Sequence, residues 1–200
     1  MMLKDSLMMD SIMKDSLLKA EKAHPGLEFE NDTLSLASLK AFEVRASQKL
    51  KDVYDYAQII LDPSIEKSFK NQAKQMMLAL FDNEETTIEI TLNENEKPQA
   101  IPIKNFINNL LNTNSPKPIF DIKDIKPSKE IRKYNKDNAY RGQLTFLQTI
   151  YRTDNSKPVI IQFGKMTASY FIIRVKKEFG ASTKEVWEVL LGNINVAQEE

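Results

Sequence analysis

The sequence predicts an α+β fold, in which two or three N-terminal helices pack on an antiparallel sheet of four to six strands. Apolar residues recur every three or four positions between residues 35 and 81, which is the period of amphipathic helices. After residue 118 they occur in strand-length runs separated by turn residues. Consecutive strands joined without crossover helices favour an antiparallel sheet with the helices on one face.

Two amphipathic helices are predicted between residues 35 and 83. The apolar stripe of the first is Leu39, Phe42, Ala46, Leu50, Val53, Ala57 and Ile60. Asp62 and Pro63 should end it and start the second helix, because Asp is a good N-cap and Pro fits the first helical position. The apolar face of the second helix is predicted to be Ile65, Phe69, Ala73, Met76, Leu80 and Phe81.

The remainder of the chain is predicted to be mostly strands. A half-buried strand from Thr87 to Leu92 is followed by a polar loop, Asn93 to Gln99, and by a short third helix, Ile103–Leu111. Four further strands are predicted at residues 118–125, 140–151, 166–179 and 185–194. Residues 159–163 are either another short strand or the beginning of the third of these.

Three segments follow from this pattern: an N-terminal spacer or tether (1–34), a domain (35–196) and a polar tail (197–200). The spacer repeats Asp-Ser-apolar every five residues, starting at Asp5, Asp10 and Asp15. Such a step keeps no single face apolar on either a helix or a strand. We therefore expect this extension to be helical or flexible, and to be ordered only against a partner.

Composition argues against several functional classes. Lys+Arg and Asp+Glu both number 28, and this zero net charge disfavours nucleic acid as a partner. The longest apolar run is far shorter than the roughly 18–20 residues of a membrane span, so no transmembrane segment is predicted. There is no cysteine for a disulfide, a thiolate metal site or a nucleophile, and the five scattered glycines form no phosphate-binding loop.

The order of the elements, with the C-terminal segment Glu185-Val-Trp-Glu-Val-Leu-Leu-Gly-Asn-Ile194, resembles the nuclear-transport-factor-2-like (cystatin-like) superfamily over residues 35–196. The resemblance implies a cone, in which a curved antiparallel sheet wraps around the long first helix. The same segment, preceded by Lys176-Lys-Glu-Phe-Gly180, is also similar to envelope lipoproteins of Gram-negative bacteria. That similarity implies a lipid anchor upstream of the numbered chain and a periplasmic or cell-envelope location if an export signal was removed. A cytoplasmic location is expected if Met1 is the native start.

Proteins of this superfamily include enzymes and binding modules, so the function depends on the site residues. The single histidine, His24, lies in the spacer, which leaves no His–Asp pair within the domain. With one His and no Cys, neither a metal site nor a cofactor is predicted. An isomerase-like pair of a carboxylate base and a tyrosine donor stays open. Its candidate members are Asp52, Asp55, Asp121, Tyr54, Tyr56, Tyr140, Tyr151 and Tyr170.

Three aromatic residues are candidates for a ligand pocket: Tyr54, Tyr170 and Trp187. Aromatic side chains commonly line the cavity of this fold, where a small apolar ligand would bind, but they also fill cores. A separate basic segment, Lys123 to Arg141, has Tyr134 and Tyr140 interleaved. It is interpreted either as a patch for an anionic surface or nucleic acid or, preferentially, as a solvated loop between strands.

The leading hypothesis is a non-catalytic binding or scaffold module of the bacterial cell envelope, which forms a homodimer or binds another protein partner. Apolar residues on strand faces that a partner sheet could cover are Leu147, Tyr151, Phe171, Ile173 and Val175. One alternative is a small-molecule lyase or isomerase that uses a pocket carboxylate and tyrosine. Another is a structural component of a secretion or conjugation assembly. No catalytic residue is assigned.

Overall fold

A computed structural model of the chain describes residues 33–91, 97–112, 117–134, 139–154, 157–180 and 182–198. These residues belong to one compact unit, Thr33–Glu200. The predicted spacer up to residue 32, with His24 and the Asp-Ser repeat, lies outside the described residues, as does the end of the polar tail.

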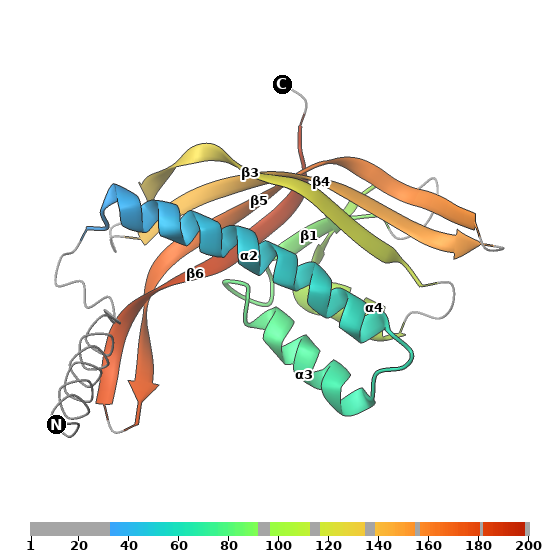
Figure 1. Cartoon of the computed structure of the whole chain (residues 1–200), viewed down its shortest axis with the longest axis horizontal. Helices are drawn as coiled ribbons and strands as arrows, with labels where there is room; N and C mark the ends of the chain where they lie inside the picture. Colours follow the sequence, from blue (N-terminus) through green and yellow to red (C-terminus); the bar gives the residue numbers. More distant parts are fainter. Residues whose placement is uncertain are drawn as a thin grey trace, which may run out of the picture. The chain divides into compact units, whose positions relative to one another are not determined.

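The described part of the chain is α+β, with three helices and a six-stranded sheet (Figure 1). The helices are α2 (Leu36–Leu61), α3 (Lys67–Leu78) and α4 (Ile103–Asn112). The strands are β1 (Thr87–Ile90), β2 (Gln99–Pro102), β3 (Ile119–Tyr134), β4 (Ala139–Asp154), β5 (Lys157–Phe179) and β6 (Ser182–Val196). Their order across the sheet is β2-β1-β6-β5-β4-β3. The predicted α+β class and the number of strands are confirmed.

The sheet is mixed, and the prediction of a purely antiparallel sheet is wrong. Strand β1 pairs with β6 in parallel, with Ile88 opposite Ile194, whereas the other neighbouring strands are antiparallel. A tight turn forces consecutive strands to run in opposite directions. No such turn joins β1 to β6, which are far apart in the sequence, so the local pattern contains no signal for their relative direction.

Helix α2 covers one face of the sheet and encloses the core (Figure 1). It begins after Ser35, whose hydroxyl accepts a hydrogen bond from the Ser38 N–H at 3.1 Å. The predicted stripe from Phe42 to Ile60 is buried, and Tyr54 is buried beside it. On β4, alternate residues face the helix, and Leu144, Phe146, Gln148 and Ile150 are at most 1% exposed. We call the helix-covered side of the sheet its inner face and the opposite side its outer face.

Helix α3 differs from the predicted second helix in both its start and its apolar face. Asp62 ends α2, and its carboxylate accepts hydrogen bonds from the Ser64 N–H and hydroxyl at 2.8 and 2.7 Å. Phe69 and Met76 are 59% and 47% exposed, whereas Met77 is fully buried. Because the two methionines are adjacent and equally apolar, the sequence alone does not show which of them faces the core.

Strand β2 was not predicted, and β3 is much longer than predicted. Strand β2 lies at the end of the predicted polar loop, where its short sequence and Pro102 conceal it. Most of the basic segment Lys123 to Arg141 is strand and not the predicted loop, because β3 continues to Tyr134 and β4 starts at Ala139. Residues 159–163 form the beginning of β5, one of the two alternatives.

Strand β3 is an irregular strand at one edge of the sheet. Its pairing with β4 shifts register at three points. Asp124 has a φ of 53°, and Pro127 has no N–H to donate. The exposed basic side chains of this strand are Lys123, Lys126, Lys129, Arg132 and Lys133.

Candidate functional site

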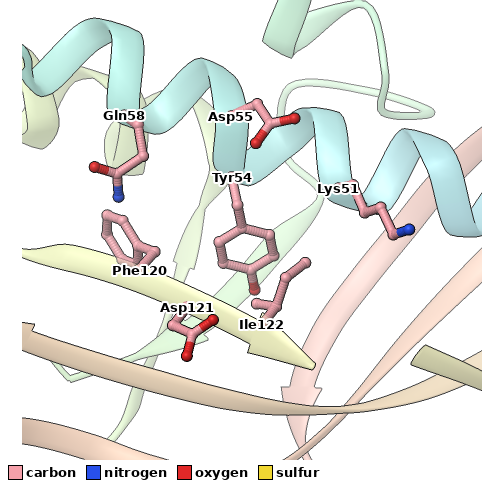
Figure 2. Close-up of a pocket in the computed structure, with 7 residues that line it drawn as sticks. All are labelled: Lys51, Tyr54, Asp55, Gln58, Phe120, Asp121 and Ile122. Atoms are coloured by element: carbon pink, nitrogen blue, oxygen red, sulfur yellow. The ribbon is translucent and has the colours of Figure 1, made fainter. Parts of the chain in front are cut away.

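Two pockets open along α2, and each contains one of the predicted pocket residues. The first, the Tyr54 pocket, lies between α2 and the edge strand β3 and has a volume of about 280 Å³. Its lining residues are Lys51, Tyr54, Asp55, Gln58, Phe120, Asp121 and Ile122. Figure 2 shows Tyr54 and Gln58 projecting from α2 toward β3, and Phe120 projecting from β3 toward the helix. Aromatic rings therefore form the inner part of this pocket.

Tyr54 is held in place by the core behind the pocket. Its ring centroid lies 6.0 Å from that of Phe120 and 6.1 Å from that of Phe146. Its hydroxyl donates a hydrogen bond of 2.5 Å to Oε1 of Gln148, which is fully buried. Burial raises the pKa of Tyr54 well above its usual range, because the phenolate would lose its hydration. The Tyr54 hydroxyl is therefore neutral, and its proton is used in the hydrogen bond to Gln148 in the core.

The carboxylates of the Tyr54 pocket lie near solvent. Asp55 is exposed, and the Asp121 side chain, which is 39% exposed, forms an ion pair of 2.8 Å with Lys123. Among the described residues, the buried polar side chains are Thr86, Thr91, Gln148, Gln162 and Ser169. A carboxylate needs desolvation or a like charge to become a base that works near neutral pH. The described residues thus provide no desolvated carboxylate for the lyase or isomerase alternative.

Other candidates for that chemistry have structural partners or lie outside the pocket. Asp52 accepts a hydrogen bond of 2.9 Å from Gln48 on the same helix. The Tyr140 hydroxyl accepts one of 2.9 Å from the Leu34 N–H and is buried. Tyr56 is half-buried on α2 and does not line the Tyr54 pocket.

The second pocket, the Trp187 pocket, lies between the N-terminal half of α2 and strands β5 and β6. Its volume is about 240 Å³. Its lining residues are Arg45, Gln48 and Lys49 of α2, Lys177 of β5, and Trp187, Glu188 and Val189 of β6. Three cations and one carboxylate thus surround an indole and a valine.

Glu188 is the anionic centre of the Trp187 pocket. Its carboxylate lies 3.5 Å from Lys49 Nζ and 3.0 Å from Lys177 Nζ. Partial burial lowers the pKa of Lys49, and the nearby Glu188 opposes that shift without cancelling it. One carboxylate therefore serves two ammonium groups, one of which is already partly desolvated.

Trp187 lies between an aromatic and a cationic neighbour. The residue is 9% exposed, and its ring meets the Tyr140 ring edge-on, with centroids 5.8 Å apart. The Arg174 guanidinium lies 5.0 Å from the indole centroid. Nearby on α2, the Arg45 guanidinium lies 5.4 Å from the Phe42 ring centroid. The contacts with Tyr140 and Arg174 fix the orientation of the indole at the base of the pocket.

Tyr170, the third predicted pocket residue, lines neither pocket. It is fully buried on the inner face, and its hydroxyl has no hydrogen-bond partner among the described residues. A Cβ atom at Gly142, its partner on β4, would lie 2.2 Å from the hydroxyl oxygen. Burial, with a smaller contribution from Glu43, raises the pKa of Tyr170 well above its usual range. Tyr170 thus fills the core, with glycine opposite to make room for its ring.

The predicted oligomer-face residues all lie on the outer face. Leu147 is 36% exposed, and Tyr151, Phe171, Ile173 and Val175 are half-buried. The prediction missed Ile160 and Phe163, which are 62% and 67% exposed. Register places Ile160 opposite Tyr151, and Phe163 opposite Thr149 two residues from Leu147. The apolar run 159–163 could have indicated these two residues. Only its pairing with β4 shows, however, that the run belongs to β5 and which of its side chains lie on the outer face.

The basic segment of β3 has one aromatic contact on the same outer face. Tyr134 is 38% exposed, and its ring centroid lies 5.4 Å from that of Phe171. The Arg141 guanidinium lies 5.8 Å from both centroids. Tyr140 is buried on the inner face, so the predicted interleaving of two tyrosines with the basic residues is not found.

No three His, Cys, Asp or Glu side chains are grouped for metal binding in the part of the chain that the structure describes. Nor does any helix within those residues have the length and apolarity that a membrane span requires. Searches against protein-family models and curated proteins give no match for the chain. Function is therefore inferred from the geometry of the chain itself.

Proposed function

We propose that the chain is a non-catalytic binding module of the nuclear-transport-factor-2-like type that self-associates through the outer face of its sheet. Two features support the fold assignment. The 26-residue helix α2 lies along the inner face, and the described elements run helix, helix, two short strands, helix and four long strands, which adds only β2 to the order on which the resemblance rests. The proposal includes the cone shape, in which the curved sheet wraps around α2.

The observation that supports self-association best is the apolar patch on the outer face. Helices cover the inner face, while Leu147, Ile160 and Phe163 are all at least 36% exposed on the opposite side. Tyr151 lies beside Ile160 in the register and extends the patch. Exposed apolar residues that lie side by side on a sheet face commonly mark interaction surfaces.

A second copy of the chain suits this patch because the patch has little net charge. In a twofold interface the same surface meets itself, so an excess of one charge would repel. Asp121 and Lys123, at the side of the patch, neutralise each other through their ion pair. Thr149 separates Phe163 from β3 and adds no charge, whereas the exposed Lys165, opposite Leu147 on β5, leaves one positive charge beside the patch. The patch is therefore compatible with a back-to-back pair of sheets.

The test is the oligomeric state of the full chain and of two matched variants. Sedimentation of the wild-type chain at micromolar concentration should show a dimer. Phe163→Ser should weaken dimerisation by at least about tenfold, because it removes the most exposed aromatic side chain of the patch. Phe69→Ser is the control, since Phe69 is 59% exposed on α3, away from the sheet.

Two outcomes would overturn the proposal. One is a wild-type chain that stays monomeric at tens of micromolar while remaining folded. The other is an equal loss of dimer in Phe69→Ser and Phe163→Ser. Circular dichroism of each variant separates a lost interface from a lost fold.

The cell-envelope location stays a prediction that rests on the C-terminal resemblance. Fractionation of cells that express the native gene would test it. Recovery of the protein with the membrane or periplasmic fraction is the expected outcome, and recovery with the cytoplasm would reject it.

A further inference from the structure

We propose that the Trp187 pocket binds a small organic anion, a carboxylate or phosphate ester with one ring or a short alkyl chain. Its anionic group would lie among Arg45, Lys49 and Lys177, and its apolar part against Trp187 and Val189. This site is independent of the outer-face patch and goes beyond self-association.

The charge of the lining residues supports an anion. Three cations and a single carboxylate line the pocket, which leaves two positive charges in excess. Glu188 is shared between Lys49 and Lys177, so neither ammonium has a carboxylate to itself in this contact. In a partly desolvated pocket an added negative charge interacts more strongly with these cations than it would in water.

The position of Lys49 strengthens this inference. Its side chain is only 21% exposed, so its ammonium has already lost part of its hydration. Arg45 lies one helical turn before it, on the same side of α2, and its guanidinium can present two parallel N–H donors to a carboxylate or phosphate. Two cations on one helix and a third on β5 thus converge on one opening.

The apolar lining residues and the volume limit the size of the ligand. Trp187 and Val189 provide the non-polar surface, and the indole is held by Tyr140 and Arg174. A volume of about 240 Å³ falls below the roughly 300–1,000 Å³ of sites for drug-sized ligands. A single ring with one anionic group fits this description better than a nucleotide or a polymer.

The Tyr54 pocket provides a contrast on the same helix. It has nearly the same volume, but one cation, Lys51, faces two carboxylates, Asp55 and Asp121. Because Lys123 pairs with Asp121, this pocket has no excess of positive charge to attract the ligand that the Trp187 pocket accepts. We therefore expect the anion to bind in the Trp187 pocket, at the N-terminal half of α2, and not in the Tyr54 pocket.

Tryptophan fluorescence tests the proposal directly, because Trp187 is the single tryptophan of the chain. The full chain is titrated with benzoate and phenyl phosphate. Inorganic phosphate, which has no ring, and benzamide, which has no charge, are the comparison probes. A saturable change with benzoate or phenyl phosphate is expected, with benzamide at least about tenfold weaker. Added NaCl should weaken binding of the anions.

Variants then distinguish a ligand site from a purely structural charge cluster. Arg45→Met and Lys49→Met should each weaken benzoate binding by about tenfold. Lys51→Met is the matched control on the same helix and should leave binding unchanged, because Lys51 lines the other pocket. Glu188→Gln should strengthen binding several-fold, because it removes the competing carboxylate and keeps the side-chain size.

Several results would overturn the proposal. These are no saturable change with either anion at millimolar concentration, equal binding of benzamide, or weakening of binding by Glu188→Gln in a protein that keeps its fold. A loss of binding in Lys51→Met as large as that in Arg45→Met would also reject it. Thermal unfolding of each variant shows whether it is folded, and Arg45→Met serves where Lys49→Met does not fold.

Discussion

The two faces of the sheet are made by the same strands, but we expect substitutions to destabilise the inner face much more than the outer face. On β4, inward-facing Leu144 and Phe146 are at most 1% exposed, whereas outward-facing Leu147 is 36% exposed. Neighbouring residues in a strand point to opposite faces, so a shift of one position moves a side chain from the core to the surface. The comparison indicates that the inner face determines the fold, while the outer face is available for contacts at little cost in stability.

The largest contrast is expected between two glycines. A Cβ in Gly142→Ala would lie 2.2 Å from Cζ of the fully buried Tyr170, so we expect a loss of about 3 kcal/mol in the free energy of unfolding. In Gly192→Ala the Cβ would lie 2.4 Å from Ser169 Oγ and 2.7 Å from Phe171 Cε2. Phe171 is half-buried on the outer face and can rotate toward solvent, so a loss of about 1 kcal/mol is expected there.

Urea unfolding of both variants measures this contrast. Equal losses would show that the outer face is packed as tightly as the inner one. Replacing Tyr170 by Leu in the Gly142→Ala background should restore part of the lost stability, since it removes the atoms that clash.

The second-largest effect is expected at alkaline pH, which should lower the free energy of unfolding through the two buried tyrosines of the inner face. Burial raises the pKa of both Tyr54 and Tyr170 in the folded state. Above about pH 10 the unfolded chain loses these protons while the folded chain keeps them, so the free energy of unfolding falls as the pH rises. Each tyrosine contributes about 1.4 kcal/mol per pH unit in that range.

Unfolding experiments in urea between pH 9 and about 11 measure this slope. Relative to the wild type, Tyr170→Phe should have a shallower decline above about pH 10, because one of the two buried hydroxyls is gone. An unchanged slope would indicate that the Tyr170 hydroxyl reaches solvent.

A smaller difference is expected between the same two tyrosines at neutral pH. Tyr54→Phe leaves the buried Gln148 without its hydrogen-bond donor and should cost about 1–2 kcal/mol. Tyr170→Phe removes a buried hydroxyl that has no hydrogen-bond partner in the described part of the chain, so it should be neutral or stabilising. Differential scanning calorimetry compares the two variants, and a larger loss in Tyr170→Phe would reveal an undetected partner of its hydroxyl.

The smallest effect is expected on the outer face itself. Phe163 is 67% exposed, so Phe163→Ser should change the free energy of unfolding of the monomer by less than about 0.5 kcal/mol. The measurement requires protein concentrations below the dissociation constant of any dimer. A loss of more than about 1 kcal/mol under those conditions would place Phe163 in the fold and not at an interface.

The parts of the fold that the sequence predicted are those with local periodicity. The stripe on α2 and the alternation on β4 each follow from the spacing of apolar residues within one element. The direction of β1 relative to β6 depends on two segments far apart in the chain. The choice between Met76 and Met77 depends on how α3 packs, and neither has a local signal.

The candidate site shows the same division. Tyr54 and Trp187 were predicted because aromatic side chains commonly line the cavity of the fold that the sequence resembles. Arg45, Lys49 and Lys177 were not, although two cations one turn apart beside the apolar stripe of α2 were a usable signal. The third cation joins them only because β5 and β6 pair as they do.

The irregularity of β3 has a consequence for how copies of the chain can associate. An exposed sheet edge is a template for the strand of another molecule, and continued addition leads to fibres. The register shifts, Pro127 and the row of lysines make β3 a poor template of this kind. An association that grows by adding strands is thereby discouraged along this side of the molecule, and closed assemblies of limited size are favoured.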